Sequence, residues 1–198
     1  MNIRAILAIA LALTVSAPAV LAGTPQNPEI TDPADTPSLD LDIRKVWVTN
    51  EASSVTFHIQ VTDLTLRQPL LDATGAEYRY HWRIDGKIRD LPFNIEGTVA
   101  YANTWTPAGV AFGMSAYGIG TYASSTMTGS RIELDAANDV VRLVSPRPTA
   151  GNFAMPEGTV LTDLKASTFI GHTAHPAFPG AARTSVDVTA VGRAYTIE

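Results

Sequence analysis

The sequence predicts an all-β fold: a single β-sandwich of immunoglobulin-like or jelly-roll type, with mainly antiparallel strands and little helix. Three observations predict it. Short runs alternate between apolar and polar residues, which is typical of strands with one face in a core and one in water. Turn-forming residues separate these runs at short intervals. Only residues 161–168 have the pattern of a helical turn, and that segment is marginally long for a helix.

The first 22 residues have the three parts of a cleavable export signal. Arg4 gives a positive start, residues 5–15 form an apolar run, and small residues end the segment at Ala22. We expect cleavage after Ala22. The alternative is an uncleaved anchor, but the apolar run is shorter than the roughly 20 residues of a membrane span. The expected product is a secreted, periplasmic or cell-surface protein with no membrane span after cleavage.

The expected mature chain consists of an irregular leader, residues 23–39, and one β-sandwich domain, residues 40–198. Four prolines in the leader prevent regular structure there. Loss of Arg4 leaves 13 basic and 19 acidic residues, a net charge of about −6. This balance disfavours nucleic acid as a partner and is compatible with a divalent cation. The chain has no cysteine, so an apolar core must hold the domain together without disulfides.

The first predicted hairpin follows the leader. Residues 46–49 alternate, and the polar residues 50–53 form a turn. Residues 55–61 then alternate strictly between apolar and polar side chains, which is the clearest strand pattern in the chain.

A second hairpin is predicted from residue 78. Residues 78–84 place Tyr, Trp and Ile side chains on one face, and Asp85-Gly86 is a favoured two-residue hairpin turn. The return strand is expected from Lys87 onward.

Shorter strand patterns complete the chain. They cover residues 99–101, 110–114, 132–134, 140–144 and 185–197. In the last of these, Val186, Val188, Tyr195 and Ile197 are candidates for the core.

The order of several segments resembles a known group of domains. These segments are residues 30–35, 41–43, 46–48, 55–64, 144–147 and 158–161, with Asp187 and Tyr195 near the end. They resemble secreted β-sandwich domains related to DOMON and family-nine carbohydrate-binding modules. Members often have Gly-Asp where this chain has Ala34-Asp35. The resemblance implies the fold, and related modules bind sugars, haem or calcium.

The acidic leader is the first candidate site. Asp32, Asp35, Asp40 and Asp42 lie close together in the sequence, and Asp187 joins them if the last long strand lies near the first. Calcium takes six to eight oxygen ligands on flexible loops, and carboxylates supply them. The alternative is that these aspartates form turns and cap backbone groups. Calcium is therefore the candidate cofactor, and no other is expected.

Histidines give two further metal candidates. His172 and His175 are three residues apart, but Gly171 and Pro176 indicate a loop, and polar loop histidines are the alternative. Haem ligation, which the resemblance suggests, would use Met114 with His58 or His81, against a core role for Met114.

Aromatic side chains are the candidates for sugar binding. Trp105 lies in the predicted loop 102–107 and is the best candidate for an exposed platform. Trp47 points away from the face of Val46 and Val48. Trp82, Tyr117 and Tyr122 are the other candidates, and a tryptophan in a β-sandwich also fits the core.

No catalytic signature stands out. Residues 113–117 approach a nucleophile elbow around Ser115 but lack its second glycine. Asp90 and Glu96 show no sign of a shared cleft. We therefore predict an exported, non-catalytic binding or accessory module, calcium-stabilised at the acidic leader. Its expected partner is an extracellular ligand, a carbohydrate or a secreted or cell-surface protein. The alternatives are a structural or adhesive cell-surface protein and a small secreted hydrolase.

Overall fold

The computed structural model describes residues 23–66, 78–101, 105–114, 123–125, 129–172 and 183–198. The predicted export signal lies outside these ranges. Within them the chain forms strands and no helix. Accordingly, this part of the chain contains no helix long and apolar enough to span a membrane.

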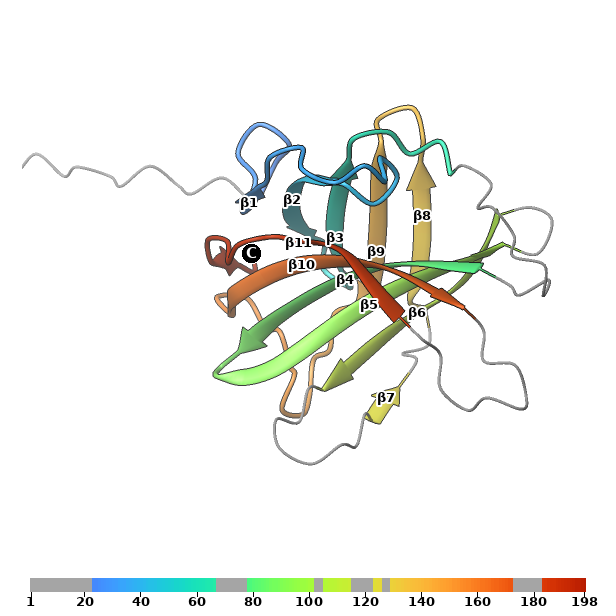
Figure 1. Ribbon diagram of the computed structural model, residues 1–198. Coiled ribbons are helices and arrows are strands. Elements are labelled where there is room, and N and C mark those ends of the chain that lie inside the picture. Colours follow the sequence, from blue (N-terminus) through green and yellow to red (C-terminus); the bar gives the residue numbers. More distant parts are fainter. Residues whose placement is uncertain (1–22, 67–77, 102–104, 115–122, 126–128, 173–182) are drawn as a thin grey trace, which may run out of the picture.

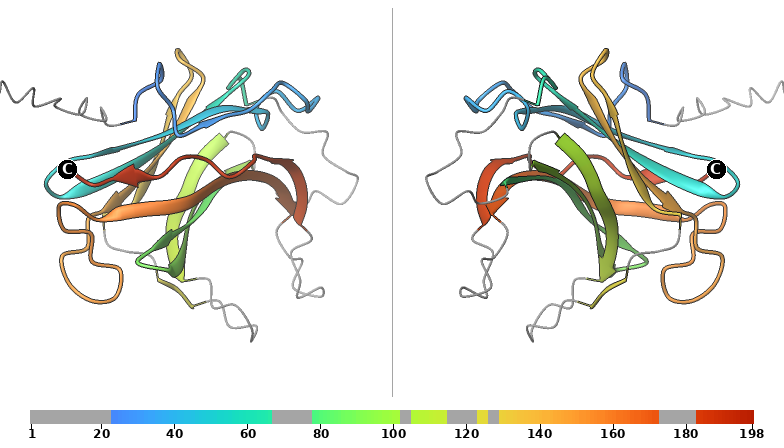
Figure 2. Two further views of the ribbon diagram at one scale, coloured as in Figure 1. Left: turned by 90° about the vertical axis from the view of Figure 1, so that its left-hand side faces the viewer. Right: turned by 90° about the vertical axis from the view of Figure 1, so that its right-hand side faces the viewer.

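The strands form two antiparallel sheets that pack face to face (Figures 1 and 2). In order across the five-stranded sheet, the strands are β1 (Ile30–Thr31), β2 (Ile43–Asn50), β3 (Ser54–Val61), β9 (Val140–Pro146) and β8 (Arg131–Asp135). The main path of the seven-stranded sheet is β11 (Arg183–Val188), β10 (Val160–His172), β4 (Tyr78–Ile88), β5 (Leu91–Tyr101), β6 (Trp105–Met114) and β7 (Ala123–Ser125). The seventh strand, β12 (Tyr195–Thr196), pairs with the start of β10. The predicted all-β sandwich is confirmed.

The core lies between the two sheets, and the alternation of β3 shows how it is built. Val55, Phe57 and Ile59 are fully buried, whereas the intervening polar side chains are partly exposed. From the opposite sheet, Trp82 and Phe93 face them, and Phe57 and Phe93 lie with ring centroids 6.0 Å apart. Burial of these large side chains supplies the main stabilisation of a domain that has no disulfide.

The predicted turn at Asp85-Gly86 is wrong. Both residues lie inside β4, and the β4–β5 turn is formed by Arg89 and Asp90, whose φ angles are 50° and 67°. A Cβ atom on Gly86 would lie 2.8 Å from the ring of Phe93. Glycine is therefore present at this position because an aromatic ring packs on its backbone, and not because the chain turns there.

The predicted helical turn at residues 161–168 is also wrong. This segment lies within β10, which pairs with β4 on one side and with β11 and β12 on the other. Tertiary pairing on both edges overrides the weak helical pattern. Near the end of the chain, Val188 is 47% exposed and does not join the core, while Tyr195 and Ile197 are buried as predicted.

The leader is less irregular than its prolines suggest. It contains β1, which pairs with β2 through Ile30 and Thr31. After β1 the leader crosses the end of the five-stranded sheet beside β11, as the views in Figures 1 and 2 agree. This crossing places the acidic residues of the leader next to the last long strand.

Candidate metal centre

The candidate site lies where the edge of the five-stranded sheet meets β11 of the seven-stranded sheet. At this junction, called the seam below, two hydrogen bonds join the segment at the start of β2 to the seven-stranded sheet. The backbone N–H of Ile43 donates to Asp187 Oδ2 over 2.7 Å, and the Thr168 hydroxyl donates to the carbonyl oxygen of Leu41 over 2.7 Å. The seam is therefore held in place by contacts that do not depend on the acidic residues of the leader.

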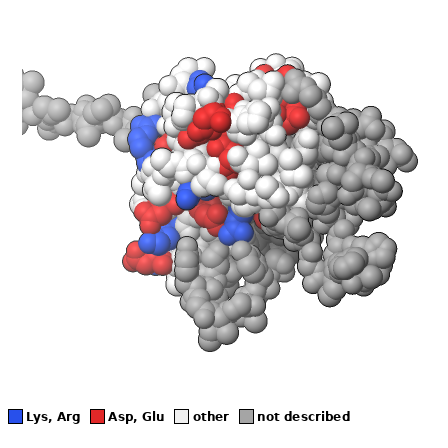
Figure 3. Space-filling model, viewed as in Figure 1, with Lys and Arg blue, Asp and Glu red and all other residues white. Residues whose placement is uncertain are grey.

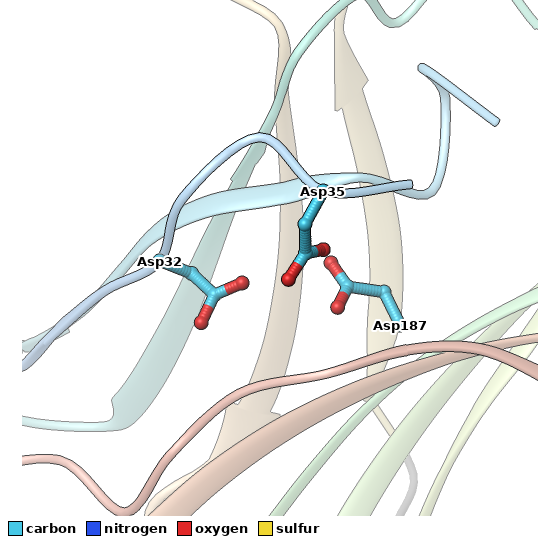
Figure 4. A group of neighbouring side chains, drawn as sticks. All are labelled: Asp32, Asp35 and Asp187. Atoms are coloured by element: carbon cyan, nitrogen blue, oxygen red, sulfur yellow. The ribbon is translucent and has the colours of Figure 1, made fainter. Parts of the chain in front are cut away.

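Three carboxylates converge at this seam. Asp32 and Asp35 come from the leader and Asp187 comes from β11, and Figure 4 shows their side chains pointing toward one another. One oxygen of each lies within 4.8 Å of the others. Two oxygens bound to one calcium ion at about 2.4 Å are at most about 4.8 Å apart. The spacing is thus compatible with a shared cation.

Asp32, just after β1, is one of the two buried members of this group. Its backbone N–H donates to the carbonyl oxygen of Arg44, which fixes the residue just after β1. The residue is 9% exposed, and its Oδ2 atom is buried with no hydrogen-bond partner in the described part of the chain. A buried carboxylate oxygen without a donor is costly, so this atom indicates a missing cationic or donor group.

Asp42 organises the loop that carries Asp35. Its Oδ1 accepts the backbone N–H groups of Asp35 and Thr36 over 3.1 and 3.2 Å, and its Oδ2 accepts the Thr62 hydroxyl. Both oxygens of this fully buried side chain are engaged. Asp42 therefore lies behind the group and positions Asp35, and the structure does not place it among the three converging carboxylates.

Asp40 lies apart from the group as well. Its Oδ1 accepts the backbone N–H of Leu66, and its carbonyl oxygen accepts the indole N–H of Trp82 over 3.3 Å. Asp40 thus ties the leader to the segment that follows β3 and to the core. Of the five predicted ligands, the structure brings together Asp32, Asp35 and Asp187.

The electrostatics of the group favour a cation. Burial, together with the smaller effects of the neighbouring Asp187, Asp35 and Asp42, raises the pKa of Asp32 from 3.8 to about 6, against an opposing effect of Arg44. Burial also raises the pKa of Asp187, although the backbone N–H groups of Ile43 and Val188 oppose it. Figure 3 shows more acidic than basic atoms on the upper half of the described surface, where the leader lies.

Trp105, the predicted sugar platform, does not lie in a loop. It is the first residue of β6, where it pairs with Tyr101. Because Trp105 already belongs to this strand, the prediction that it lies in a loop is wrong. Tyr117, Tyr122, Ser115 and His175 lie outside the described residues, and His172 ends β10.

Trp47 faces outward from the five-stranded sheet, as predicted, yet it is only 5% exposed. It stacks on His58 of β3, with ring centroids 4.8 Å apart and an interplanar angle of 8°. Because the side chain is almost fully buried, Trp47 offers little surface to a sugar ring.

One polar pair was missed by sequence reasoning. His81 and Glu96 are neighbours on the outer face of the seven-stranded sheet, and His81 Nδ1 lies 3.0 Å from Glu96 Oε1. Thr98 Oγ1 also lies 3.1 Å from the same nitrogen. The alternation of β4 and β5 places all three on one face, but pairing them needs the strand register. Asp90, considered as a partner of Glu96, lies instead in the β4–β5 turn.

Comparisons of the chain with protein-family models, curated proteins and solved structures gave no match. The resemblance to DOMON and family-nine carbohydrate-binding modules therefore stays a prediction.

Proposed function

We propose that this chain is an exported, non-catalytic binding or accessory module whose β-sandwich is stabilised by calcium bound to Asp32, Asp35 and Asp187. One observation carries the proposal. The buried, unpartnered Oδ2 atom of Asp32 belongs to a side chain that points at two further carboxylates. Hydrogen bonds within the protein satisfy Asp42 and one oxygen of Asp187, but the described residues provide no donor for this atom.

Calcium suits this group better than the alternatives. All three side chains offer hard oxygen ligands, and no cysteine is available for a softer metal. Asp35 is exposed, so water can complete the six to eight ligands that calcium takes. The part of the leader after β1 is also a loop, and its backbone can adjust to the flexible coordination geometry of calcium more readily than to the strict octahedron of magnesium.

The proposed ion has a clear structural role. Its two positive charges would offset most of the charge of the three clustered carboxylates, and the ion would tie the leader to β11 across the junction of the two sheets. An exported domain without disulfides gains stability from such a link, since any ligand that binds only the folded state stabilises it. The expected ligand or partner of the module remains an extracellular carbohydrate or protein.

Thermal unfolding of the wild type and of Asp32→Asn, each in chelator and in calcium, tests this proposal. At a calcium concentration of about 100 times Kd, binding adds about 2.7 kcal/mol. For a chain of this size that raises Tm by about 5 to 10 °C. Asp32→Asn is expected to lose this gain. In chelator the same variant is expected to be at least as stable as the wild type, because it removes a buried like charge.

Asp163→Asn is the matched control. This substitution also removes one carboxylate, but from an exposed ion pair between Asp163 of β10 and Lys87 of β4. Its Tm is expected to respond to calcium as the wild type does. If calcium leaves the Tm of the wild type unchanged, or raises that of Asp32→Asn equally, the proposed site is wrong.

A further inference from the structure

The amino-terminal end of the described chain lies against a buried carboxylate. Gly23 is buried, and a Cβ atom built on it would lie 2.2 Å from Oε2 and 2.7 Å from Oε1 of Glu29. The carboxylate of Glu29 therefore occupies the space beside the Cα atom of Gly23. Only glycine fits there without displacing it.

A tight turn brings Gly23 to this position. The backbone N–H of Asn27 donates to the carbonyl oxygen of Thr24 over 3.0 Å, which folds residues 24–27 back on themselves. Two cationic side chains hold the turn from outside. Lys45 Nζ donates to the carbonyl oxygen of Pro25, and Arg193 donates to the carbonyl oxygens of Asn27 and Pro28. These hydrogen bonds hold the turn, and the turn holds Gly23 against Glu29.

Within the described part of the chain, the buried carboxylate of Glu29 accepts a backbone hydrogen bond but has no cation in direct contact. The residue is 8% exposed, and its Oε2 accepts the backbone N–H of Val48 over 2.9 Å. The described residues contribute no ion pair to it. Burial raises its pKa, while the N–H of Val48, its own backbone N–H and the more distant Arg193 lower it less. Tyr195 is a further ionisable group close enough to interact with it.

We propose that Glu29 is the receptor for the α-ammonium group of Gly23, which removal of the export signal creates. Hydrolysis of the Ala22–Gly23 bond by a signal peptidase consumes one water and leaves a carboxylate on Ala22 and an amine on Gly23. The amine takes up a proton at neutral pH. A neutral amide with one N–H thereby becomes a cation with three, one bond away from the Cα atom that faces Glu29.

With this pairing, removal of the export signal adds to the stability of the folded domain. Before cleavage none of the described residues places a cation directly against this buried carboxylate, and after cleavage the new ammonium group supplies one. The inference depends on the predicted cleavage site and is independent of calcium, because Glu29 is not one of the three converging carboxylates.

Three forms of the exported chain test the pairing: residues 23–198 with a free Gly23 amine, the same chain acetylated at Gly23, and the chain that retains Ala22. Each is made with Glu29 and with Glu29→Gln, and unfolding is measured in denaturant, in chelator and in calcium. With Glu29, acetylation or retention of Ala22 is expected to raise the unfolding equilibrium constant about tenfold, the equivalent of one pKa unit. With Glu29→Gln the change is expected to be under about twofold, and calcium leaves both ratios unchanged.

Two measurements on the wild type keep the test independent of the folding of Glu29→Gln. The mass of the exported chain is expected to show Gly23 as its first residue. In NMR titration the α-ammonium group is expected to have a pKa above its ordinary value of about 8. A different first residue, an unshifted α-ammonium pKa, or equal effects of acetylation in both backgrounds would each overturn the proposal.

Discussion

Asp32 and His58 show how burial acts on single ionisable groups in this protein, with opposite signs. Burial raises the pKa of Asp32, which is an acid, and lowers that of His58, which is a base. In both cases the folded protein favours the neutral form. The difference lies in the neighbours. Asp32 faces two carboxylates that a cation can share, whereas His58 is satisfied as a neutral ring by Trp47 and by Thr49 Oγ1 at 2.8 Å.

His58 gives the pH prediction. Burial, with a smaller effect of Arg142, lowers its pKa from 6.5 to about 4, against the opposing effect of Glu133. Between these values the unfolded chain binds a proton that the folded chain does not, so stability falls as pH falls from 7 to 4. The loss is about 2 kcal/mol after allowance for partial exposure.

Denaturant unfolding of the wild type and of His58→Gln between pH 4 and 7 measures this loss. The contribution of Asp32 runs in the other direction, but it is common to both proteins and cancels in the difference. Parallel pH profiles for the two proteins would contradict the assignment to His58.

Asp42 gives a prediction that separates a positioning residue from a ligand. Because its oxygens accept two backbone N–H groups and a hydroxyl, Asp42→Asn is expected to lower the free energy of unfolding by about 1 to 3 kcal/mol. The loss is expected in chelator as well as in calcium. A loss seen only in calcium would instead make Asp42 a direct ligand.

At the scale of single elements, the strands could be predicted from the sequence where the signal is local. The strict alternation of residues 55–61 indicates β3, and the polar residues 50–53 indicate the turn before it. Prediction failed where distant pairing decides. Residues 161–168 form part of β10 because β4, β11 and β12 pair with that strand, and no property of the segment itself contains this information.

The candidate site follows the same division. The aspartates of the leader could be recognised because they lie within a few residues of one another. Asp187 could be included only by assuming that the last long strand lies near the first, since its contact with Ile43 joins residues 144 positions apart. The different roles of Asp35, which points into the group, and Asp42, which accepts hydrogen bonds from the loop backbone, could not be predicted. They depend on which carboxylate the folded loop turns toward its own backbone.

In the β4–β5 hairpin, substitutions at two places are expected to change the stability of the protein in opposite directions. Arg89 and Asp90 adopt positive φ angles, so replacing them with Asn-Gly is expected to stabilise the protein by about 1 kcal/mol. Gly86→Ala is expected to destabilise it by about 1 to 3 kcal/mol, because the added methyl collides with Phe93. Denaturant unfolding checks both. A neutral Gly86→Ala together with a destabilising Asn-Gly would place the turn at Asp85-Gly86 after all.

In the whole molecule, the seam between the sheets brings together the leader and β11, which are far apart in the sequence. The leader crosses the edge of β2, β11 comes from the last part of the sequence, and Ile43 and Asp187 join them. Strand pairing and the core determine the two sheets. At the seam, the fully buried Leu41 and Ile43 belong to the core, and hydrogen bonds of Asp187 and Thr168 link the two sides. The three carboxylates beside them repel one another when all are ionised, and a bound cation would relieve this repulsion.

Equilibrium dialysis of chelator-treated protein measures directly whether the three carboxylates bind calcium. One saturable site per chain is expected, with a Kd between about 10⁻⁵ and 10⁻³ M, as in extracellular calcium modules and weaker sensors. Asp32→Asn and Asp187→Asn are expected to abolish this binding, and Asp163→Asn to retain it. No saturable binding at calcium concentrations up to about 10 mM, well above the Kd of the weakest such modules, would show that the carboxylates do not form a calcium site.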